Sequence, residues 1–235
     1  KKKRILDMKT VNEVQTKVYM KKSLTFDQLS SNLEKFIVQT LSQDPEMLKI
    51  HTELGFKPYC WGWLQPVERD GVYKEGEIYS FRLRTIDAKL ADYLQRTLSE
   101  TSTHSMKGLV SLKKTIPFKY IESLYSITPI VIKIGNDGYW KNNFTIKDFE
   151  NQIKTNLFKK YKDFIDADLD ESMPVFNYME ITNRKPFSIP YKTIHLLGDK
   201  VNLGVDVNPT AQKLAYLSLG CGLGVQNSSG FGFMG

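Results

Sequence analysis

Residues 220–235, GCGLGVQNSSGFGFMG, end the chain with glycines spaced Gly-x-Gly-x-Gly and, five residues later, Gly-Phe-Gly. Glycine adopts positive φ without steric cost and lets another backbone or a ligand come close. Such a loop presents backbone N–H groups with no side chains in front of them, which suits phosphate oxygens. Flexible linkers share this composition. However, Leu214, Leu217 and Leu219 have helical spacing before the loop, and Phe231 and Phe233 alternate as in a strand after it, which favours an ordered loop.

The glycine pattern does not match either common nucleotide-binding motif. No Gly-Lys-Ser/Thr follows the glycines, which argues against a P-loop. The glycines follow a helical segment and do not open one after a strand, so a dinucleotide fingerprint is also disfavoured. The loop is therefore expected to serve a different phosphate-containing ligand.

Working back from the loop, the second half of the chain carries two helix starts. Asn208-Pro209 begins a helix up to about Leu219, since proline suits the first helical position. Thr145 caps a helix whose apolar residues fall on one face. We expect strands around these helices at 124–134, 174–184, 192–207 and 231–234.

The first half has the same order of elements. Thr25-x-x-Gln28 is a capping box for a helix that places Leu29, Leu33, Phe36, Ile37 and Leu41 on one face. Asp44-Pro45 starts a second, short helix, and Asp87 caps a third. Strands are expected at 11–20, 57–67, 77–86 and 107–118.

Both halves thus fit the order β-α-β-β-α-β, which is the ferredoxin-like plan. We predict an α+β fold of two tandem ferredoxin-like (RRM-like) domains, with antiparallel sheets and helices on one face. The predicted domains are residues 1–120 and residues 121–235, the second containing the glycine-rich loop. A chain of 235 residues accommodates two such units without long unexplained loops.

The charge of the chain points to a polyanionic partner. The formal net charge is +7, and aromatic residues make up 12% of the chain. Basic clusters lie beside aromatic rings in the sequence, an arrangement that suits single-stranded RNA, although an inert basic surface is the alternative. The clusters are Lys113-Lys114, Lys159-Lys160-Lys162 and Arg184-Lys185.

Several other classes of protein are disfavoured. No stretch approaches the roughly 20 apolar residues of a membrane span. The N-terminal KKKRILDMKT has no apolar signal core, so a cytoplasmic location is expected. Cys60 and Cys221 are far apart and are expected to be reduced thiols. No carboxylate or metal cluster has useful spacing, which disfavours a small-molecule enzyme and predicts neither a metal nor a cofactor.

His51 and Lys57 are the candidates for chemistry. His51 lies near the end of a short expected helix, and Lys57 follows across a glycine turn. A histidine that transfers a proton and a lysine that supports negative charge on a phosphate can together cleave RNA. A histidine after a helix is more often structural, and a lysine after glycine is more often solvated. His104 lies in a polar stretch and His195 within an expected strand, so neither is a catalytic candidate.

Taken together, these motifs resemble a known family. GLGVQNSSGFG near the C-terminus, the doubled ferredoxin-like plan and His51-x5-Lys57-Pro-Tyr before a strand are similar to the CRISPR-associated endoribonucleases that cut precursor repeat RNA into guide RNAs. The stretch SITPI and the run GVDVNPTAQKLAYLSLG support this resemblance, which covers nearly the full length. The wider group of repeat-associated RNA-binding proteins shares the C-terminal motif.

The resemblance implies metal-independent cleavage of CRISPR repeat RNA by 2′-hydroxyl attack, leaving 2′,3′-cyclic phosphate and 5′-hydroxyl ends. It implies catalytic roles for His51, as general base or acid, and for Lys57. A tyrosine of some relatives is replaced by Phe36, so the alternatives are a His-Lys pair alone or a third role for another hydroxyl such as Tyr59. The loop also lacks the lysine or arginine that relatives often carry. The implied RNA contacts are Gly220, Gly222, Gly224, Gln226, Asn227, Ser228, Gly230, Gly232, Lys113, Lys114, Arg184 and Lys185.

Two alternatives stay open. A non-catalytic RNA-binding subunit of a CRISPR effector complex shares the fold and the loop. A general RNA-binding module would stack bases on strand aromatics such as Tyr79 and Phe81, which fit a core face equally well. The expected partners are repeat RNA and, in the subunit alternative, effector-complex subunits, and the expected state is a monomer or a homodimer.

Overall fold

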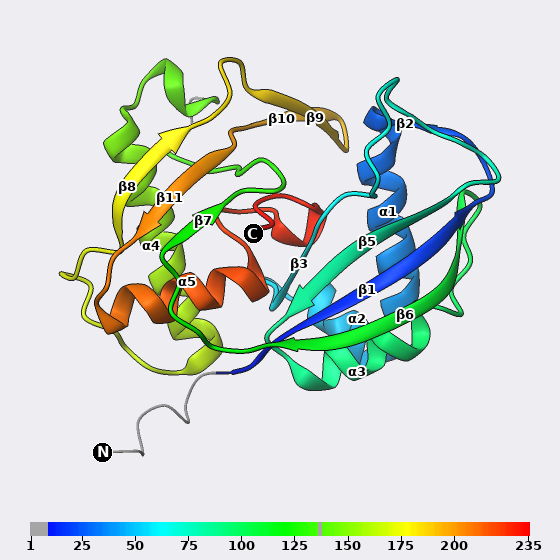
Figure 1. Ribbon diagram of the computed structural model, residues 1–235, viewed down its shortest axis with the longest axis horizontal. Helices are drawn as coiled ribbons and strands as arrows, with labels where there is room; N and C mark the ends of the chain where they lie inside the picture. The colour runs from blue at the N-terminus through cyan, green and yellow to red at the C-terminus, as the bar shows by residue number, and fades with distance from the viewer. Residues whose placement is uncertain (1–8, 136–137) are drawn as a thin grey trace.

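The computed structural model describes residues 9–135 and 138–235. Figure 1 shows two α/β units side by side, with the C-terminal segment, drawn in red, between them. The first unit has a four-stranded antiparallel sheet in the order β3-β5-β1-β6. Its elements are β1 (Val11–Met20), α1 (Phe26–Leu41), α2 (Pro45–Thr52), β3 (Tyr59–Trp61), β5 (Ile78–Thr85), α3 (Ala88–Thr97) and β6 (Met106–Ile116), with the small pair β2 (Leu24–Thr25) and β4 (Val72–Tyr73).

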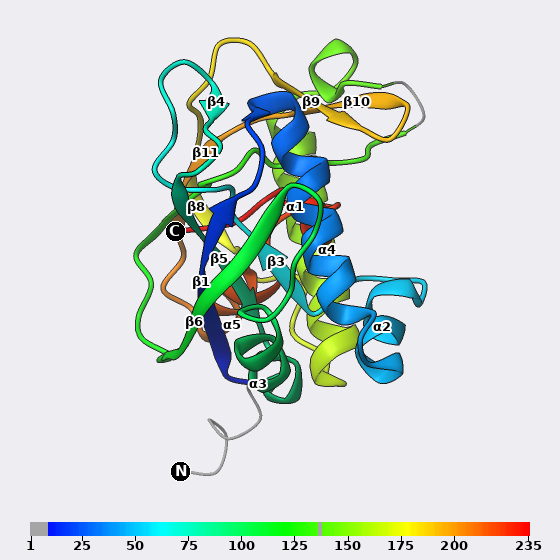
Figure 2. The same cartoon turned by 90° about the vertical axis from the view of Figure 1, so that its right-hand side faces the viewer.

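Local sequence signals explain the helices of this unit. Thr25 and Gln28 form the capping box that starts α1, and the side chain of Asp87 accepts a hydrogen bond from the amide of Leu90 at the start of α3. Figure 2 shows α1 and α3 on the same side of the first sheet. Val14 and Val18 on β1 face these helices and are buried. Each helix thus buries its apolar face on the sheet, as the ferredoxin-like plan requires.

The second unit repeats this plan with shorter strands. Its sheet has the order β7-β11-β8, and Met234 adds a single bridge beside Ser126, next to β7. The last segment therefore occupies the place that β6 holds in the first unit. The elements are β7 (Ser123–Tyr125), η1 (Trp140–Asn142), α4 (Ile146–Ile165), β8 (Phe176–Ile181), β9 (Phe187–Tyr191), β10 (Ile194–Gly198), β11 (Val201–Val205), α5 (Pro209–Cys221) and η2 (Asn227–Ser229).

Four expected strands are shorter or less regular than the sequence predicts. The strand expected at 57–67 is reduced to β3, and that at 124–134 to β7 followed by isolated bridges from Ile130 and Val131. The strand expected at 192–207 is split because its two parts pair in different sheets, β10 with β9 and β11 with β7 and β8; Asp199 between them accepts hydrogen bonds from Tyr139 and Trp140. At 231–234 a single bridge replaces the expected strand.

The two units share their interior. One core cluster gathers under the first sheet, and the second gathers between α4, α5 and the short sheet. Phe231 and Ile189 nevertheless belong to the first cluster, and Val11 belongs to the second. The hairpin β9–β10 reaches towards α1 (Figure 1) and packs against it. The division of the chain at residue 120 stays a prediction.

Tyr79 and Phe81 belong to this interior and not to an open face. They are 3% and 1% exposed. The suggestion that they stack RNA bases is therefore wrong, because both rings lie on the helix-facing side of the sheet. Their role is to fill the first core.

Candidate functional site

His51 lies in the last turn of α2, where it meets β3. Asp44 and Pro45 start the helix, since the Asp44 side chain accepts hydrogen bonds from the amides of Glu46 and Met47. The His51 imidazole is half-buried, and its Nδ1 lies 2.7 Å from the hydroxyl of Tyr59 on β3. This contact fixes one edge of the ring and leaves Nε2 as the nitrogen available to a ligand.

The surroundings of His51 favour its neutral form. Burial lowers the pKa of His51 below 6.5, and the charge of Lys57 lowers it further. Burial also lowers the pKa of Lys57, whose ammonium donates to the carbonyl oxygen of Glu53. At neutral pH the imidazole is therefore ready to accept a proton, and a cation lies near it.

Tyr59 can hold the imidazole but cannot itself reach a ligand, because only 1% of it is exposed. Burial raises the pKa of Tyr59 well above its ordinary value, with a further contribution from the Glu34 carboxylate, so the phenol stays protonated. When Nδ1–H donates to the Tyr59 oxygen, Nε2 carries the free lone pair of a base. The hydroxyl suggested from the sequence is thus in contact with His51, whereas Phe36 is fully buried and packs edge-on against Phe81.

Glu34 on α1 extends the site to the glycine-rich loop. Its Oε1 accepts a hydrogen bond of 2.8 Å from the Ser229 hydroxyl, and burial raises its pKa. Trp61, two residues after Tyr59, donates its Nε1–H to the Ser228 carbonyl at 2.8 Å. Glu34 was not predicted from the sequence. It is an isolated acidic residue beside the apolar face of α1, and no recognisable motif surrounds it.

The loop glycines are buried and do not form an open row of amides. The amides of Gly222, Gly230 and Gly232 donate to carbonyls of Ser218, Asn227 and Pro129. The expectation of free N–H groups is therefore wrong for these three residues. Gly220 and Gly224 are buried as well.

Close packing explains the glycine at position 230. Gly230 has φ +88°, and a Cβ atom there would lie 2.5 Å from the Trp61 ring. The glycines thus let the loop pack into the interior between the two units, and RNA contacts by Gly220, Gly222, Gly224, Gly230 and Gly232 stay a prediction.

Asn227 is also committed to the protein. Its Nδ2 donates to the carbonyls of Leu223 and Phe231, and its Oδ1 accepts from Lys160 on α4 at 2.7 Å. The hydrogen-bonding groups of the Asn227 side chain are thus used within the protein, and the RNA contact predicted for Asn227 stays a prediction. Gln226 and Ser228 are half-buried and keep polar side chains at the surface.

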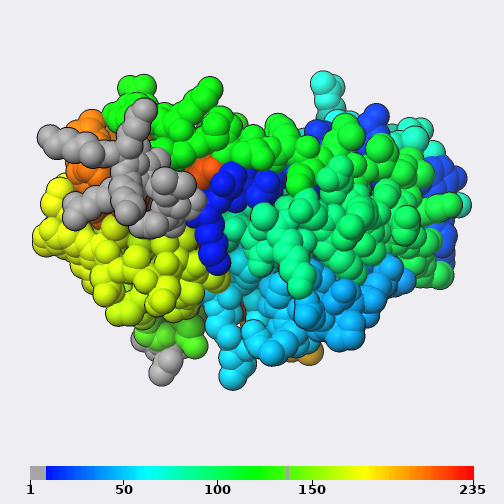
Figure 3. Space-filling view, turned by 90° about the horizontal axis from the view of Figure 1, so that it is seen from below, coloured from blue at the N-terminus to red at the C-terminus, as the bar shows by residue number. Residues whose placement is uncertain are grey.

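A pocket of about 340 Å³ joins the two motifs that the sequence singled out. Gly55, Phe56 and Lys57 line one side, and Val225 to Ser228 line the other, with Asp163 from α4. Seen from below in Figure 3, the cyan loop after α2 lies beside the yellow-green α4. The Lys57 ammonium and the polar loop groups suit a phosphate-containing ligand, while the Asp163 carboxylate on the α4 side repels one.

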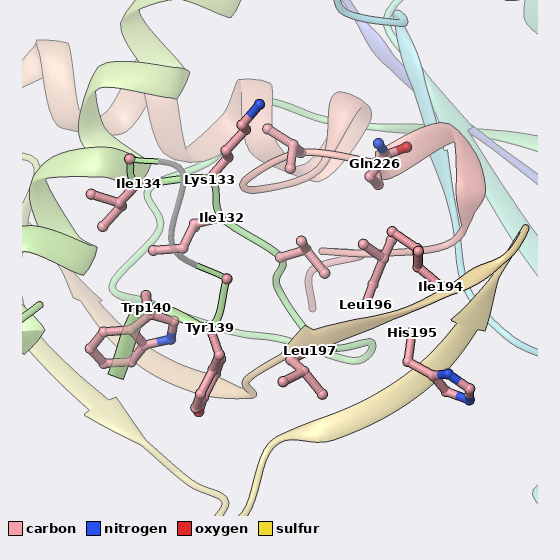
Figure 4. A pocket seen from close by; sticks show the side chains of 14 residues that line it. Ile132, Lys133, Ile134, Tyr139, Trp140, Ile194, His195, Leu196, Leu197 and Gln226 are labelled. Carbon is pink, nitrogen blue, oxygen red and sulfur yellow. The ribbon is translucent and has the colours of Figure 1, made fainter. Parts of the chain in front are cut away.

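A second pocket, of about 420 Å³, adjoins the same loop and is mainly apolar. Ile132, Tyr139 and Leu196 line it, with Lys133 and Gln226 nearby (Figure 4). Figure 4 shows the imidazole of His195 directed away from these side chains, as expected for a histidine outside the candidate site. Gln226 thus lines both pockets.

The predicted basic contacts lie in three different environments. Lys113 and Lys114 are on β6, at the opposite edge of the first sheet from β3, and pair with Asp92 and Glu13. Arg184 and Lys185 are exposed between β8 and β9, and their side chains form no ion pair within residues 9–135 and 138–235.

Lys160, in the cluster Lys159-Lys160-Lys162, is 1% exposed, so the interpretation of that position as a surface cation is wrong. It lies on the buried face of α4, three residues after Leu157 and seven after Ile153, where the helical period places it among apolar residues.

In the described part of the chain, no group of three or more His, Cys, Asp and Glu residues is placed to hold a metal ion. Among the same residues, no helix combines the length and the hydropathy needed to cross a bilayer. Cys60 and Cys221 are buried free thiols.

Comparisons with known proteins agree with this architecture. Residues 113–235 match the family model described as CRISPR associated protein Cas6, C-terminal. The chain is 22% identical to CRISPR-associated endoribonuclease Cas6 2 of Methanocaldococcus jannaschii, over 91% of this chain and 95% of that protein.

Solved structures extend the similarity to the whole fold. A structure titled CRISPR associated protein Cas6 has a TM-score of 0.71 at 19% identity, covering 96% of this chain and 98% of that one. A Cas6-related protein from Pyrococcus furiosus gives 0.69 at 14% identity, with the same coverage. A Cas6 product complex gives 0.65 at 18% identity, again covering 96% and 98%.

Proposed function

The chain belongs to the Cas6 family of CRISPR-associated proteins, and on that premise we propose that it cleaves precursor CRISPR RNA within its repeats without a metal ion. This membership confirms the family resemblance drawn from the sequence, and the matched residues 113–235 include the glycine-rich loop. The named relative in Methanocaldococcus jannaschii is an endoribonuclease, and one similar structure is a product complex. Both proteins support RNA processing as the proposed activity of this chain.

The observation that carries the mechanism is the contact of 2.7 Å between His51 Nδ1 and the Tyr59 hydroxyl, where burial and the charge of Lys57 lower the pKa of His51. In the proposed reaction, His51 Nε2 accepts the proton of a ribose 2′-hydroxyl as that oxygen attacks the adjacent phosphorus. The bond from phosphorus to the 5′-oxygen breaks, that oxygen takes up a proton from water, and the imidazolium returns its proton to the solvent. The products are a 2′,3′-cyclic phosphate and a 5′-hydroxyl.

Lys57 supplies the second part of this mechanism. As the 2′-oxygen attacks, negative charge grows on the non-bridging phosphate oxygens, and a nearby ammonium stabilises it. Lys57 lines the pocket shared with Gln226 and Ser228, so a scissile phosphate in that pocket meets the ammonium and the polar loop together. Tyr59 acts through His51 and is a positioning residue.

A deoxy substitution tests this proposal. The protein is incubated with EDTA and labelled repeat RNA from its host, beside the same RNA with one deoxynucleotide at the cleavage site. We expect one cut in the unmodified RNA, a cyclic phosphate at the new 3′ end, and binding without cleavage of the deoxy RNA. Equal cleavage of both RNAs would rule out attack by the 2′-hydroxyl, and loss of cleavage in EDTA would rule out the metal-independent reaction.

Binding of both RNAs without any cleavage would favour a non-catalytic subunit of an effector complex. Association with effector subunits, a monomeric or homodimeric state and a cytoplasmic location are further parts of the proposal. The RNA partner rests on the homologues, because one of the similar structures is titled as an RNA-binding protein of the same wider group.

A further inference from the structure

Lys160 is a buried ammonium outside the proposed reaction. It projects from α4 and is 1% exposed. Its Nζ donates to the Gly222 carbonyl and to the Asn227 side-chain oxygen, both at 2.7 Å. A charged group in the interior destabilises a fold unless its hydrogen bonds offset the loss of hydration. The bonds of Lys160 are directed at a single element, the glycine-rich loop.

No carboxylate compensates this charge within the described residues. Burial lowers the pKa of Lys160, and the ionisable groups that influence it are the thiols of Cys60 on β3 and Cys221 on α5. Burial raises the pKa of the Cys221 thiol to about 11, and it raises that of Cys60 further, so both are neutral at pH 7. Lys160 is thus paired with dipoles of the loop and not with an anion.

Lys160 contacts both walls of the pocket that contains Lys57. On the loop side it holds Asn227, whose amide in turn donates to the carbonyls of Leu223 and Phe231. On the other side its Nζ lies 5.5 Å from the centre of the Phe56 ring, a cation–π contact next to Lys57. One ammonium therefore joins the loop to the segment that carries the proposed phosphate-binding lysine.

We propose that Lys160 is a positioning residue for RNA: its buried ammonium fixes the distance between the glycine-rich loop and the Phe56–Lys57 segment, so that the pocket between them is preformed for the RNA backbone. This inference rests on the proposed RNA-processing function. Lys160 does not touch the RNA, since Asn227 and Phe56 stand between it and the pocket. Without it, the loop has to be ordered by the RNA itself, and affinity falls.

Binding of an uncleavable repeat RNA, deoxy at the cleavage site, tests this role in the full-length protein. Lys160→Met keeps the length of the side chain and removes the donors. We expect the Kd to rise by about tenfold, which is the usual effect of losing a charged hydrogen bond. Lys147→Met is the matched control, because Lys147 is an exposed lysine on the same helix that pairs with Glu150. We expect its Kd to stay within about twofold of the wild type.

The salt dependence of binding separates positioning from direct contact. A lysine that neutralises one phosphate of a single strand contributes about 0.7 to the slope of log Kd against log salt. We expect Lys57→Met to lose about this amount, and Lys160→Met to keep the wild-type slope with a higher Kd at every salt concentration. A loss of slope in Lys160→Met would contradict a positioning role, and so would an unchanged Kd.

Asn227→Ala removes the acceptor of the hydrogen bond from Lys160, and it tests the positioning role if Lys160→Met does not fold. We expect it to raise the Kd by a similar factor, and the double variant to be no weaker than the weaker single variant. Multiplied effects in the double variant, or an unchanged Kd in Asn227→Ala, would overturn the proposal. If the wild type does not bind repeat RNA at all, the proposed function fails instead.

Discussion

The contact between His51 and Tyr59 is the residue-scale basis of the proposed mechanism. Their contact of 2.7 Å orients the imidazole from the buried side, and the same hydroxyl can stabilise the imidazolium that forms when Nε2 takes up a proton. Because Tyr59 is buried, its hydroxyl affects the reaction only through His51.

Tyr59→Phe therefore should lower kcat by about tenfold, which corresponds to one hydrogen bond. KM should stay within about twofold, since Tyr59 does not touch RNA. Tyr73→Phe is the matched control, because Tyr73 is equally buried and its hydroxyl donates to the Leu64 carbonyl at 3.2 Å. Single-turnover and steady-state rates measure both variants. Equal kcat values for the two would contradict the positioning role of Tyr59.

The pH dependence of cleavage follows from the lowered pKa of His51. A general base must be neutral, so kcat should be level above pH 6.5 and fall only on the acidic side of that value. Lys57→Met removes one of the two causes of the shift, so the acidic limb should move to higher pH while the rate falls. A rate that falls as pH rises through this range would assign His51 the role of acid.

The same residues show what a sequence can and cannot predict. His51 and Lys57 could be proposed from the sequence because proton transfer and phosphate binding require those residue types close together, and their catalytic roles stay a prediction. Glu34 and Lys160 could not be proposed, because their importance depends on contacts with residues about 195 and 62 positions away in the chain, which no local pattern records.

At the scale of elements, the glycine-rich loop packs closely into the interior and places Gln226 and Ser228 in the same pocket as Lys57. Gly230 lies against Trp61, and Trp61 in turn holds the Ser228 carbonyl. The loop glycines were predicted as a phosphate cradle, yet the pocket is lined by the residues between them. Spacing of glycines shows that backbone comes close to something, but it does not show whether that neighbour is a ligand or a ring of the protein.

Gly230→Ala should test this packing. A Cβ at Gly76, with φ +85°, would meet no atom within 4 Å, so Gly76→Ala measures the backbone cost alone. That cost is about 1–2 kcal/mol. Gly230→Ala, with φ +88°, adds the contact with Trp61 and should lower the free energy of unfolding by about 1–3 kcal/mol more. Chemical denaturation compares them, and equal losses would show that the loop is not tightly packed.

Helices were easier to predict than strands. Thr25, Asp87 and Thr145 each cap the helix that the sequence assigned to them. The strands of the second unit depend on partners from distant segments, and one expected strand is split between two sheets at Asp199. Caps act within four residues, whereas the extent of a strand is decided by what lies beside it.

At the scale of the whole molecule, the net charge of +7 predicts that RNA affinity falls with salt. Individual cations should contribute unequally. Lys114 lies 3.0 Å from the buried Glu13 carboxylate and Lys113 pairs with Asp92, whereas Arg184 and Lys185 have exposed side chains. A lysine that already forms an ion pair must break that pair before it binds a phosphate, so it adds less to the affinity for RNA.

The double variant Arg184→Ala/Lys185→Ala should therefore reduce the salt slope by up to about 1.4, corresponding to two phosphates of a single strand. Lys113→Ala/Lys114→Ala should reduce it by less than half of that. Filter binding at several salt concentrations gives both slopes. A larger reduction from the second pair would mean that RNA crosses the β6 edge of the first sheet.

The two-unit fold was predictable because each half repeats one order of elements, and the family match over residues 113–235 agrees with it. How the halves share a core was not, since Phe231 and Val11 each pack into the opposite cluster. We propose that this shared region contains a nuclease site built on His51.

The most direct test is the single-turnover cleavage rate of His51→Ala in EDTA, beside His195→Ala. His195 is an exposed histidine that points away from the neighbouring pocket (Figure 4). Loss of a general base should slow cleavage by about 10²- to 10⁴-fold with little change in RNA affinity, and His195→Ala should cleave at the wild-type rate. Cleavage by His51→Ala at the wild-type rate would contradict the account and would place the chemistry on another residue.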